Sequence, residues 1–254
     1  MALDPSRHDG KAGTEGSRRP AARLLFAGAM LLLTVAFVAL GAWQVQRLFW
    51  KLDLIARVDA RVHAQPVPVP PPARWAGFDG KDEEYRRVTA EGTFDHDKEV
   101  LVQAVTDLGA GFWVVTPLRQ ADGTTILINR GFVPAGRRDA SSRAEGEVPG
   151  IVRVTGLLRL TESGGAFLRA NDPTAGRWYS RDVDAIAAAA RLSTVAPYFI
   201  DADATANPGG LPIGGLTVVR FRNSHLVYAL TWFTMAALSV AAAVFLLRQR
   251  RRED

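Results

Sequence analysis

Two apolar stretches decide the fold: Leu24–Trp43, with the sequence LLFAGAMLLLTVAFVALGAW, and Leu226–Leu247, with the sequence LVYALTWFTMAALSVAAAVFLL. Each is about 20 residues long, the length that a helix needs to cross the roughly 30 Å hydrocarbon core of a bilayer. We therefore expect a membrane protein with transmembrane helices over residues 24–44 and 225–247. The region between them is mixed in polarity and should fold in water.

The two tails carry the excess of positive charge. Residues 1–23 and 248–254 hold nine of the 31 Lys and Arg residues but only five of the 26 Asp and Glu residues. The middle region is nearly neutral, so the net charge of +5 indicates topology rather than nucleic-acid binding. The positive-inside rule then places both tails in the cytoplasm and the middle domain outside. The N-terminal tail should be disordered.

The first stretch should be retained as a membrane anchor and not cleaved as a signal peptide, because its apolar core exceeds the about 7–15 residues of a secretory signal.

The segment after the first span has two parts. From Val45 to Val62 apolar residues recur at three- and four-residue steps, which predicts an amphipathic juxtamembrane helix over residues 45–64. This helix would pack on the outer domain or lie on lipid. Residues 65–73, QPVPVPPPA, favour polyproline II geometry and predict a semi-rigid spacer. The outer domain would span residues 74–224.

Short apolar or alternating runs separated by turn residues fill the outer domain, and their close spacing predicts antiparallel strands. One helix is expected at about Val183–Leu192. The fold class is therefore an α+β membrane protein, with two transmembrane helices flanking one mainly antiparallel β domain that includes a short helix. Either a barrel or a sandwich would suit the strand number. The expected strands are Tyr85–Phe94, Glu99–Thr106, Phe112–Leu118, Thr125–Phe132, Val152–Leu160, Tyr198–Asp201 and Thr217–Phe221.

The amino-acid composition excludes several classes of catalytic and metal site. The chain has no cysteine, which excludes disulfides, thiolate catalysis and cysteine zinc sites. Neither a Gly-x-Ser-x-Gly elbow nor a His-Glu-x-x-His motif occurs. An enzyme is therefore not expected, although a membrane-tethered hydrolase would need only a serine or carboxylate pair that meets in a cleft. Three of the four histidines, His8, His63 and His96, fall in polar segments and are expected to be solvated.

His225 is different, because it stands at the start of the second span. An ionisable side chain in a membrane helix is costly to bury unpaired, so it is a candidate functional residue. Tyr228, Ala229 and Trp232 follow it at helical spacing and should share its face. The alternative is that His225 and the two aromatic residues form only an interfacial anchor.

The first span offers a matching set of side chains at the same depth: Trp43, Gln44 and Arg47. A cation, an amide and a large ring opposite a histidine suit a ligand that has acidic groups and a metal centre. Arg222, just before the second span, could also pair with acidic groups. The candidate binding residues are therefore Trp43, Gln44, Arg47, Arg222, His225, Tyr228 and Trp232, with His225 as the metal ligand.

A series of short motifs extends in order from about residue 40 to residue 232, and together they resemble the surfeit locus protein 1 family of cytochrome c oxidase assembly factors. The motifs are Leu40-Gly41-Ala42-Trp43-Gln44 with Arg47, Trp50 and Lys51; Glu84-Tyr85-Arg86-Arg87-Val88 with Gly92-Thr93-Phe94; Gly111-Phe112-Trp113-Val114-Val115-Thr116-Pro117-Leu118; Ile128-Asn129-Arg130-Gly131-Phe132-Val133-Pro134; Asn171-Asp172-Pro173 with Trp178-Tyr179 and Asp182; and Gly214-Gly215 with Asn223, His225, Leu226, Tyr228, Thr231 and Trp232.

The resemblance implies a two-span protein of the bacterial cytoplasmic membrane, or of the mitochondrial inner membrane, that helps to assemble haem-copper oxidases. It further implies haem a as the bound cofactor, His225 as its ligand, and oxidase subunit I and other assembly factors as partners. On this interpretation the spans form a haem-binding clamp at the outer membrane edge. Two alternatives stay open: a haem-free scaffold that binds oxidase subunits through the β domain, and the membrane-tethered hydrolase.

Overall fold

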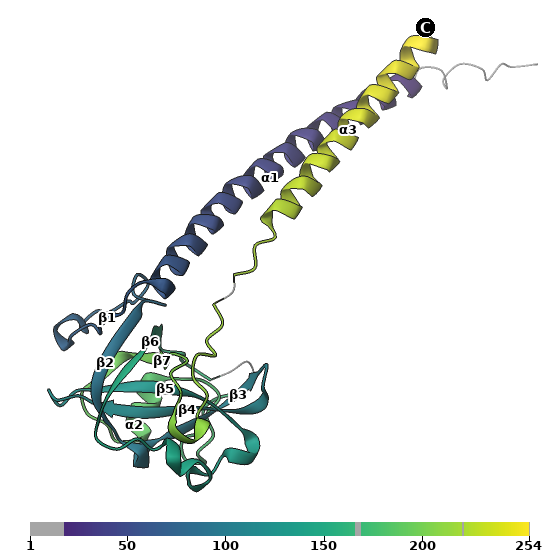
Figure 1. Cartoon of the computed structure of the whole chain (residues 1–254). Helices are drawn as coiled ribbons and strands as arrows, with labels where there is room; N and C mark the ends of the chain where they lie inside the picture. Colours follow the sequence, from purple (N-terminus) through teal and green to yellow (C-terminus); the bar gives the residue numbers. More distant parts are fainter. Residues whose placement is uncertain (1–17, 166–168, 220, 254) are drawn as a thin grey trace, which may run out of the picture. The chain divides into compact units, whose positions relative to one another are not determined.

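The computed structural model describes residues 18–165, 169–219 and 221–253 (Figure 1). The chain divides into two compact units. One comprises Met1–Ile55 with Phe221–Asp254, and the other comprises Ala56–Arg220. The disorder expected for the N-terminal tail falls mainly on residues 1–17, which lie outside the described residues.

The first unit contains most of α1 (Arg18–His63), up to Ile55, and all of α3 (His225–Glu253). Both are long and apolar enough to cross a membrane. The predicted transmembrane and juxtamembrane helices are one unbroken helix, α1, whose 46 residues give a length of about 69 Å. It ends two residues before Gln65-Pro66, because proline disfavours helical geometry in the residue that precedes it.

The two helices run antiparallel and side by side (Figure 1). Their least exposed positions recur at alternating steps of three and four residues, the 3-4 repeat of left-handed helix pairs. Half of these residues are Gly, Ala, Ser or Thr, small side chains that let helix backbones approach closely in a membrane. We call this set the seam: Ala27, Met30, Thr34, Phe37, Gly41, Gln44 and Leu48 on α1, with His225, Ala229, Trp232, Ala236, Ser239, Ala243 and Leu246 on α3.

The second unit is a β domain with one short helix, α2 (Val183–Ala189). Asp182 caps this helix by accepting a hydrogen bond from the Ala185 N–H, a common role of aspartate at a helix start. The strands are β1 (Val67–Pro68), β2 (Arg87–Phe94), β3 (Val100–Thr106), β4 (Gly109–Arg119), β5 (Thr125–Pro134), β6 (Ile151–Leu160) and β7 (Val195–Ala202). Short 3-10 segments occur at Pro72–Arg74, His96–Lys98, Ala135–Arg137, Ala140–Gly146, which is kinked at Arg143, and Pro208–Gly210.

The strands form one sheet in the order β1-β2-β6-β7-β5-β4-β3. An additional pairing of β2 with β4 closes β2, β6, β7, β5 and β4 into a ring, so the domain is a barrel rather than a sandwich. The pairings are antiparallel except those of β1 with β2 and of β5 with β7. The predicted fold class, two membrane helices flanking a mainly antiparallel β domain with a short helix, is confirmed.

Two hydrophobic clusters stabilise the domain. The first fills the barrel with inward-facing residues of β2, β4, β5, β6 and β7, among them Val88, Leu118, Ile128 and Tyr198. The second joins the outer surface of β3, β4, β5 and β7 to α2 through Trp178, Ile186 and other residues. Alternating strand residues thus serve two cores.

Two segments differ from expectation. Residues 65–73 pack on the β domain and are not a separate spacer, since β1 pairs with β2 at the edge of the sheet and the buried Tyr198 hydroxyl donates to the Pro70 carbonyl at 2.9 Å. Burial raises the pKa of Tyr198, which keeps this donor neutral. The prediction of a strand at 217–221 is wrong for its described residues. Instead, Ile213 pairs with Phe132, where Gly131, at φ 132°, leaves room for the crossing backbone.

Candidate functional site: the histidine of the helix pair

His225 begins α3, where the Asn223 side chain accepts a hydrogen bond from the His225 backbone N–H at 3.4 Å. The Nδ1 atom of its imidazole lies 2.7 Å from Oε1 of Gln44 on the opposite helix. Gln44 is buried, with 9% of its surface exposed. No hydrogen-bond partner of the other ring nitrogen, Nε2, is present among the described residues.

Aromatic and small residues continue the seam beyond His225. Ala229 is buried one turn on, and Trp232 stacks on Phe37 of α1 with ring centroids 5.7 Å apart. The seam therefore places one imidazole and a stacked ring pair in order along the same contact, with a small residue between them.

Gly41 on α1 lets the Phe233 ring of α3 pack against the helix backbone, because a Cβ at Gly41 would lie 2.6–2.9 Å from ring atoms of Phe233. Replacing Gly41 by leucine should lower the free energy of unfolding of the helix pair by about 1–3 kcal/mol, since the side chain would overpack the interface. Thermal unfolding in detergent measures this change. A Cβ at Gly28 meets no atom within 4 Å, so Gly28→Leu is the matched control. If Phe233→Ala failed to rescue Gly41→Leu, the steric explanation would be wrong.

Among the described residues, no hydrogen bond, ion pair or ring contact joins the imidazole to the other predicted site residues. Trp43 and Tyr228 are 53% and 55% exposed, and Arg222 is also exposed. Arg47 lies over the Trp50 ring at 4.1 Å. The described structure thus brings together His225 and Gln44, with Trp232 further along the seam, while the roles of the remaining four residues toward a ligand stay predictions.

Sequence reasoning did not identify Phe37 or Phe233 as partners in the helix pair. The alternation of three- and four-residue steps among Thr34, Phe37, Gly41 and Gln44 was the available signal. Uniform hydrophobicity around the helix obscured it, because lipid-facing positions are as apolar as the packed ones.

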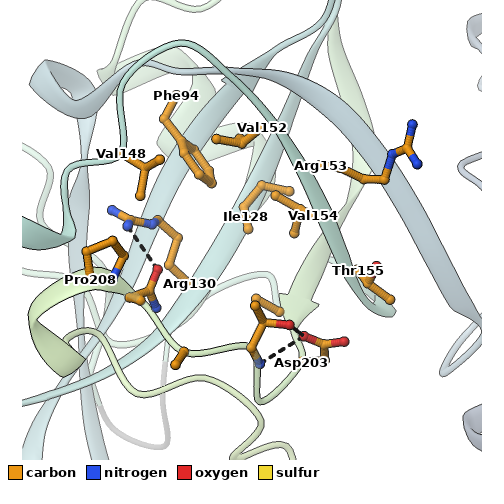
Figure 2. Close-up of a pocket in the computed structure, with 14 residues that line it drawn as sticks. Phe94, Ile128, Arg130, Val148, Val152, Arg153, Val154, Thr155, Asp203 and Pro208 are labelled. Atoms are coloured by element: carbon orange, nitrogen blue, oxygen red, sulfur yellow. Dashed lines mark hydrogen bonds between the residues drawn. The ribbon is translucent and has the colours of Figure 1, made fainter.

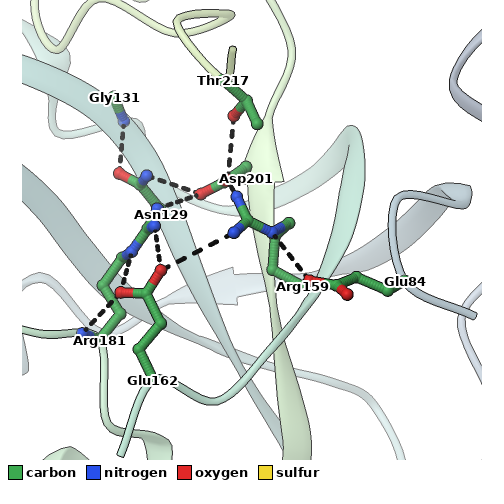
Figure 3. Close-up of polar contacts among 8 residues, drawn as sticks. All are labelled: Glu84, Asn129, Gly131, Arg159, Glu162, Arg181, Asp201 and Thr217. Atoms are coloured by element: carbon green, nitrogen blue, oxygen red, sulfur yellow. Dashed lines mark hydrogen bonds and ion pairs between the residues drawn. The ribbon is translucent and has the colours of Figure 1, made fainter. Parts of the chain in front are cut away.

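The β domain contains a buried polar cluster centred on Asp201, which is 2% exposed (Figure 3). Its Oδ1 accepts hydrogen bonds from Asn129 at 2.7 Å and from Arg181 at 2.8 Å. Its Oδ2 accepts from Arg159 and from Thr217, each at 2.9 Å. The Asp201 cluster, comprising Asn129, Arg159, Glu162, Arg181, Asp201 and Thr217, therefore ties the segment that leads towards α3 to three neighbouring strands.

A small cavity of about 190 Å³ lies beside Arg130 of β5 (Figure 2). Arg130 is 2% exposed, stacks over the Phe94 ring at 4.8 Å and donates to Asn207 Oδ1 at 3.2 Å. His96 is half-buried rather than fully solvated as expected: its ring lies 5.5 Å from that of Phe94 and its Nδ1 is 3.5 Å from Arg130. Burial of Arg130 leaves almost no surface for a ligand.

No hydrolytic or metal cluster is evident among the described residues. They hold no group of three or more His, Asp or Glu side chains that could bind a metal ion. The buried Ser180 accepts hydrogen bonds from the Gly165 N–H and the Asn171 amide, each at 3.0 Å, and no described histidine hydrogen-bonds to it. Nothing in this geometry activates a nucleophile.

Comparison with known proteins decides the family. The sequence profile of the SURF1 family matches residues 31–237, which include both Gln44 and His225. This chain belongs to the SURF1 family. Surfeit locus protein 1 of Homo sapiens is 38% identical over 256 residues, covering 93% of this chain and 82% of the human protein. The mouse protein of the same name is 41% identical over 224 residues, with 82% and 71% covered, and a SURF1-like protein of Monosiga brevicollis is 40% identical over 235 residues, with 87% of each chain covered.

The SURF1 motif Asn129-Arg130-Gly131 has a structural role in this chain. In the Asn129-Arg130-Gly131 motif, Asn129 binds Asp201, Arg130 is buried against Phe94, and Gly131 admits the crossing backbone. These residues stabilise the barrel and its connection to the following segment. The histidine of the last SURF1 motif has instead a partner on the other membrane helix.

Acid should destabilise the barrel of this SURF1-family protein through Glu162. Burial alone would raise the pKa of Glu162, but hydrogen bonds and charge from Arg181 hold it below the ordinary 4.5. A depressed folded-state pKa contributes stability that is complete above the unfolded pKa and is lost as pH falls through the folded value. Unfolding free energy should therefore be level near neutrality and decline below about pH 4.5. Denaturant titrations across this range measure it, and an unchanged acid slope in Glu162→Gln would contradict the assignment.

Proposed function

We propose that this protein is an assembly factor for haem-copper cytochrome c oxidase, which binds haem a on its membrane helices and assists its insertion into oxidase subunit I. The observation that carries the proposal is the seam imidazole of His225, whose Nδ1 is held by Gln44 while Nε2 has no partner among the described residues. Family membership supports the same role. The protein acts as a chaperone and not as an enzyme.

The residues fit a haem on the chemistry of their donors. Neutral imidazole is a haem iron ligand, and iron-bound histidines almost always bond a carbonyl or carboxylate through the second nitrogen. A bound haem would supply two kinds of group: an iron that an imidazole nitrogen can ligate, and two propionates that pair with cations. Arg47 and Arg222 would pair with the propionates, because a guanidinium binds both oxygens of a carboxylate. Trp43, Tyr228 and Trp232 would contribute flat apolar surface.

The proposed location is the bacterial cytoplasmic membrane, with both termini in the cytoplasm and the β domain in the periplasm. The supporting observation is the cationic flank of each span: Arg18, Arg19 and Arg23 before the first, and Arg248, Arg250, Arg251 and Arg252 after the second. His225 then lies at the outer edge of the bilayer. Alkaline phosphatase fusions after residue 254 and within the β domain should be inactive and active, respectively.

The test is to purify the protein from cells that make haem a and to extract and identify any bound haem from its absorption spectrum. Haem a is expected, and it should be transferred to apo subunit I when the two proteins are mixed in detergent. Protein that stays haem-free in such cells, or that carries haem b alone, would overturn the cofactor assignment.

A second candidate, the haem-free scaffold, is favoured by one feature of the β domain. Among its described residues four large hydrophobic side chains are more than half exposed: Val105, Leu108, Ile151 and Val218. Three of them, all except Ile151, line one cleft of about 700 Å³. Apolar side chains gathered in this way are typical of a protein contact.

The scaffold predicts that Leu108→Ser abolishes co-purification with oxidase subunit I, whereas His225→Ala does not. Ile151→Ser is the matched control, because Ile151 is similarly exposed but lies outside the cleft. The haem-binding proposal expects that His225→Ala removes oxidase activity although subunit I still co-purifies.

A further inference from the structure

The neutral imidazole of His225 has two forms with opposite abilities. One ring nitrogen carries the hydrogen and donates, while the other carries a lone pair and accepts. Only the nitrogen with the lone pair can bind a metal ion. Whichever group occupies one nitrogen therefore decides what the other can bind.

Gln44 occupies Nδ1. The amide oxygen Oε1, an acceptor, faces that nitrogen at 2.7 Å, so the hydrogen belongs on Nδ1 and the lone pair on Nε2. The contact joins two helices and lies between residues 181 positions apart in the chain, so helix pairing creates it. Because Gln44 is buried in the seam and points at the imidazole, it has little surface left for a ligand.

We infer that Gln44 is a positioning residue: it holds His225 in the Nδ1–H tautomer and so presents the Nε2 lone pair to the cofactor. This inference rests on the proposed haem binding and changes the role of Gln44 from a ligand contact to a group that acts through His225. A glutamine suits a membrane site, because it offers a carbonyl acceptor without the cost of burying a carboxylate. Replacing such a partner typically weakens metal binding about 10–100-fold.

The tautomer can be measured without haem. Nitrogen NMR of the full chain in lipid nanodiscs, labelled with ¹⁵N-histidine, distinguishes protonated from unprotonated ring nitrogens, and His225→Gln identifies the His225 signals by their loss. In the wild type, Nδ1 should be protonated and Nε2 unprotonated. Gln44→Leu should increase the Nε2–H form. The same tautomer in both proteins would overturn the inference.

Haem titrations provide the second arm. Gln44→Leu should weaken haem binding about 10–100-fold, while Gln44→Glu should keep the affinity and lower the haem reduction potential, since a carboxylate accepts more strongly. Gln46→Leu is the matched control, because Gln46 is exposed two positions further along α1. Equal affinities for Gln44→Leu and Gln46→Leu would contradict the positioning role. If His225→Ala itself retained haem, the proposed assignment of His225 as the haem ligand would fail, and the NMR arm would still decide whether Gln44 sets the tautomer.

Discussion

Replacing Asp201 by alanine should lower the free energy of unfolding of the β domain by about 3–5 kcal/mol, because removing one partner of a buried ion pair leaves the other uncompensated. Asp201 is 2% exposed and accepts hydrogen bonds from both Arg159 and Arg181, whose side chains are 15% and 12% exposed. Asn129 and Thr217 would lose an acceptor as well. Because Glu162 would still pair with Arg181, we expect a loss of unfolding free energy near the lower end of this range.

Guanidinium unfolding of the full chain in detergent, followed by near-ultraviolet circular dichroism, measures this loss. Glu91→Ala is the matched control, because its pair with Arg153 is 57% and 73% exposed, and such pairs contribute less than about 1 kcal/mol. Thr217→Val, which removes a single hydrogen bond, should cost about 1 kcal/mol. Equal effects of Asp201→Ala and Glu91→Ala would mean that the cluster does not stabilise the barrel.

Replacing His225 by alanine should remove nearly all haem from the purified protein, because His63, the other described histidine of the helix pair, lies at the C-terminal end of α1, beyond Gln44, and cannot replace the lost nitrogen. Oxidase activity in cells that depend on this protein should fall with the haem content. The ratio of extracted haem to protein measures the effect directly.

His63→Ala controls for a general effect of losing an imidazole, since His63 lies at the end of α1 with a side chain 73% exposed. The variant His225→Gly offers a stricter test, because added imidazole can enter the space left by the side chain. Partial recovery of bound haem with imidazole is expected. If His225→Ala bound as much haem as the wild type, His225 would not be the ligand of the haem iron.

The predictions from sequence are most accurate where a local pattern determines structure. Apolar length identifies both spans, and periodicity identifies the helical extension from Val45 to Val62. The helix expected at about Val183–Leu192 is present as α2. Residues 67–68 were missed as a strand, because prolines indicate extended geometry but not the partner that β2 provides. The predicted strand at 217–221 has the composition of a strand, yet Thr217 bonds Asp201 there instead of joining a ladder.

The candidate site was predictable in part. An ionisable residue at the start of a span identifies His225 from sequence alone. Its pairing with Gln44 depends on the rotation of two helices about their axes, which hydropathy does not specify. Trp43 and Tyr228 show the consequence, because they neighbour Gln44 and His225 in sequence or on the helix but are more than half exposed. The Asp201 cluster is non-local, with Asn129 and Asp201 separated by 72 positions, and no sequence motif predicts it.

Pulsed electron paramagnetic resonance of the ferric haem bound to protein labelled with ¹⁵N-histidine shows whether His225 supplies the axial nitrogen. A bound histidine nitrogen couples to the unpaired electron, and ¹⁵N and ¹⁴N give different couplings. We expect a label-dependent nitrogen coupling in the wild type, replaced by that of unlabelled imidazole in rescued His225→Gly. Bound haem whose axial nitrogen signal is unaffected by the label would contradict the account.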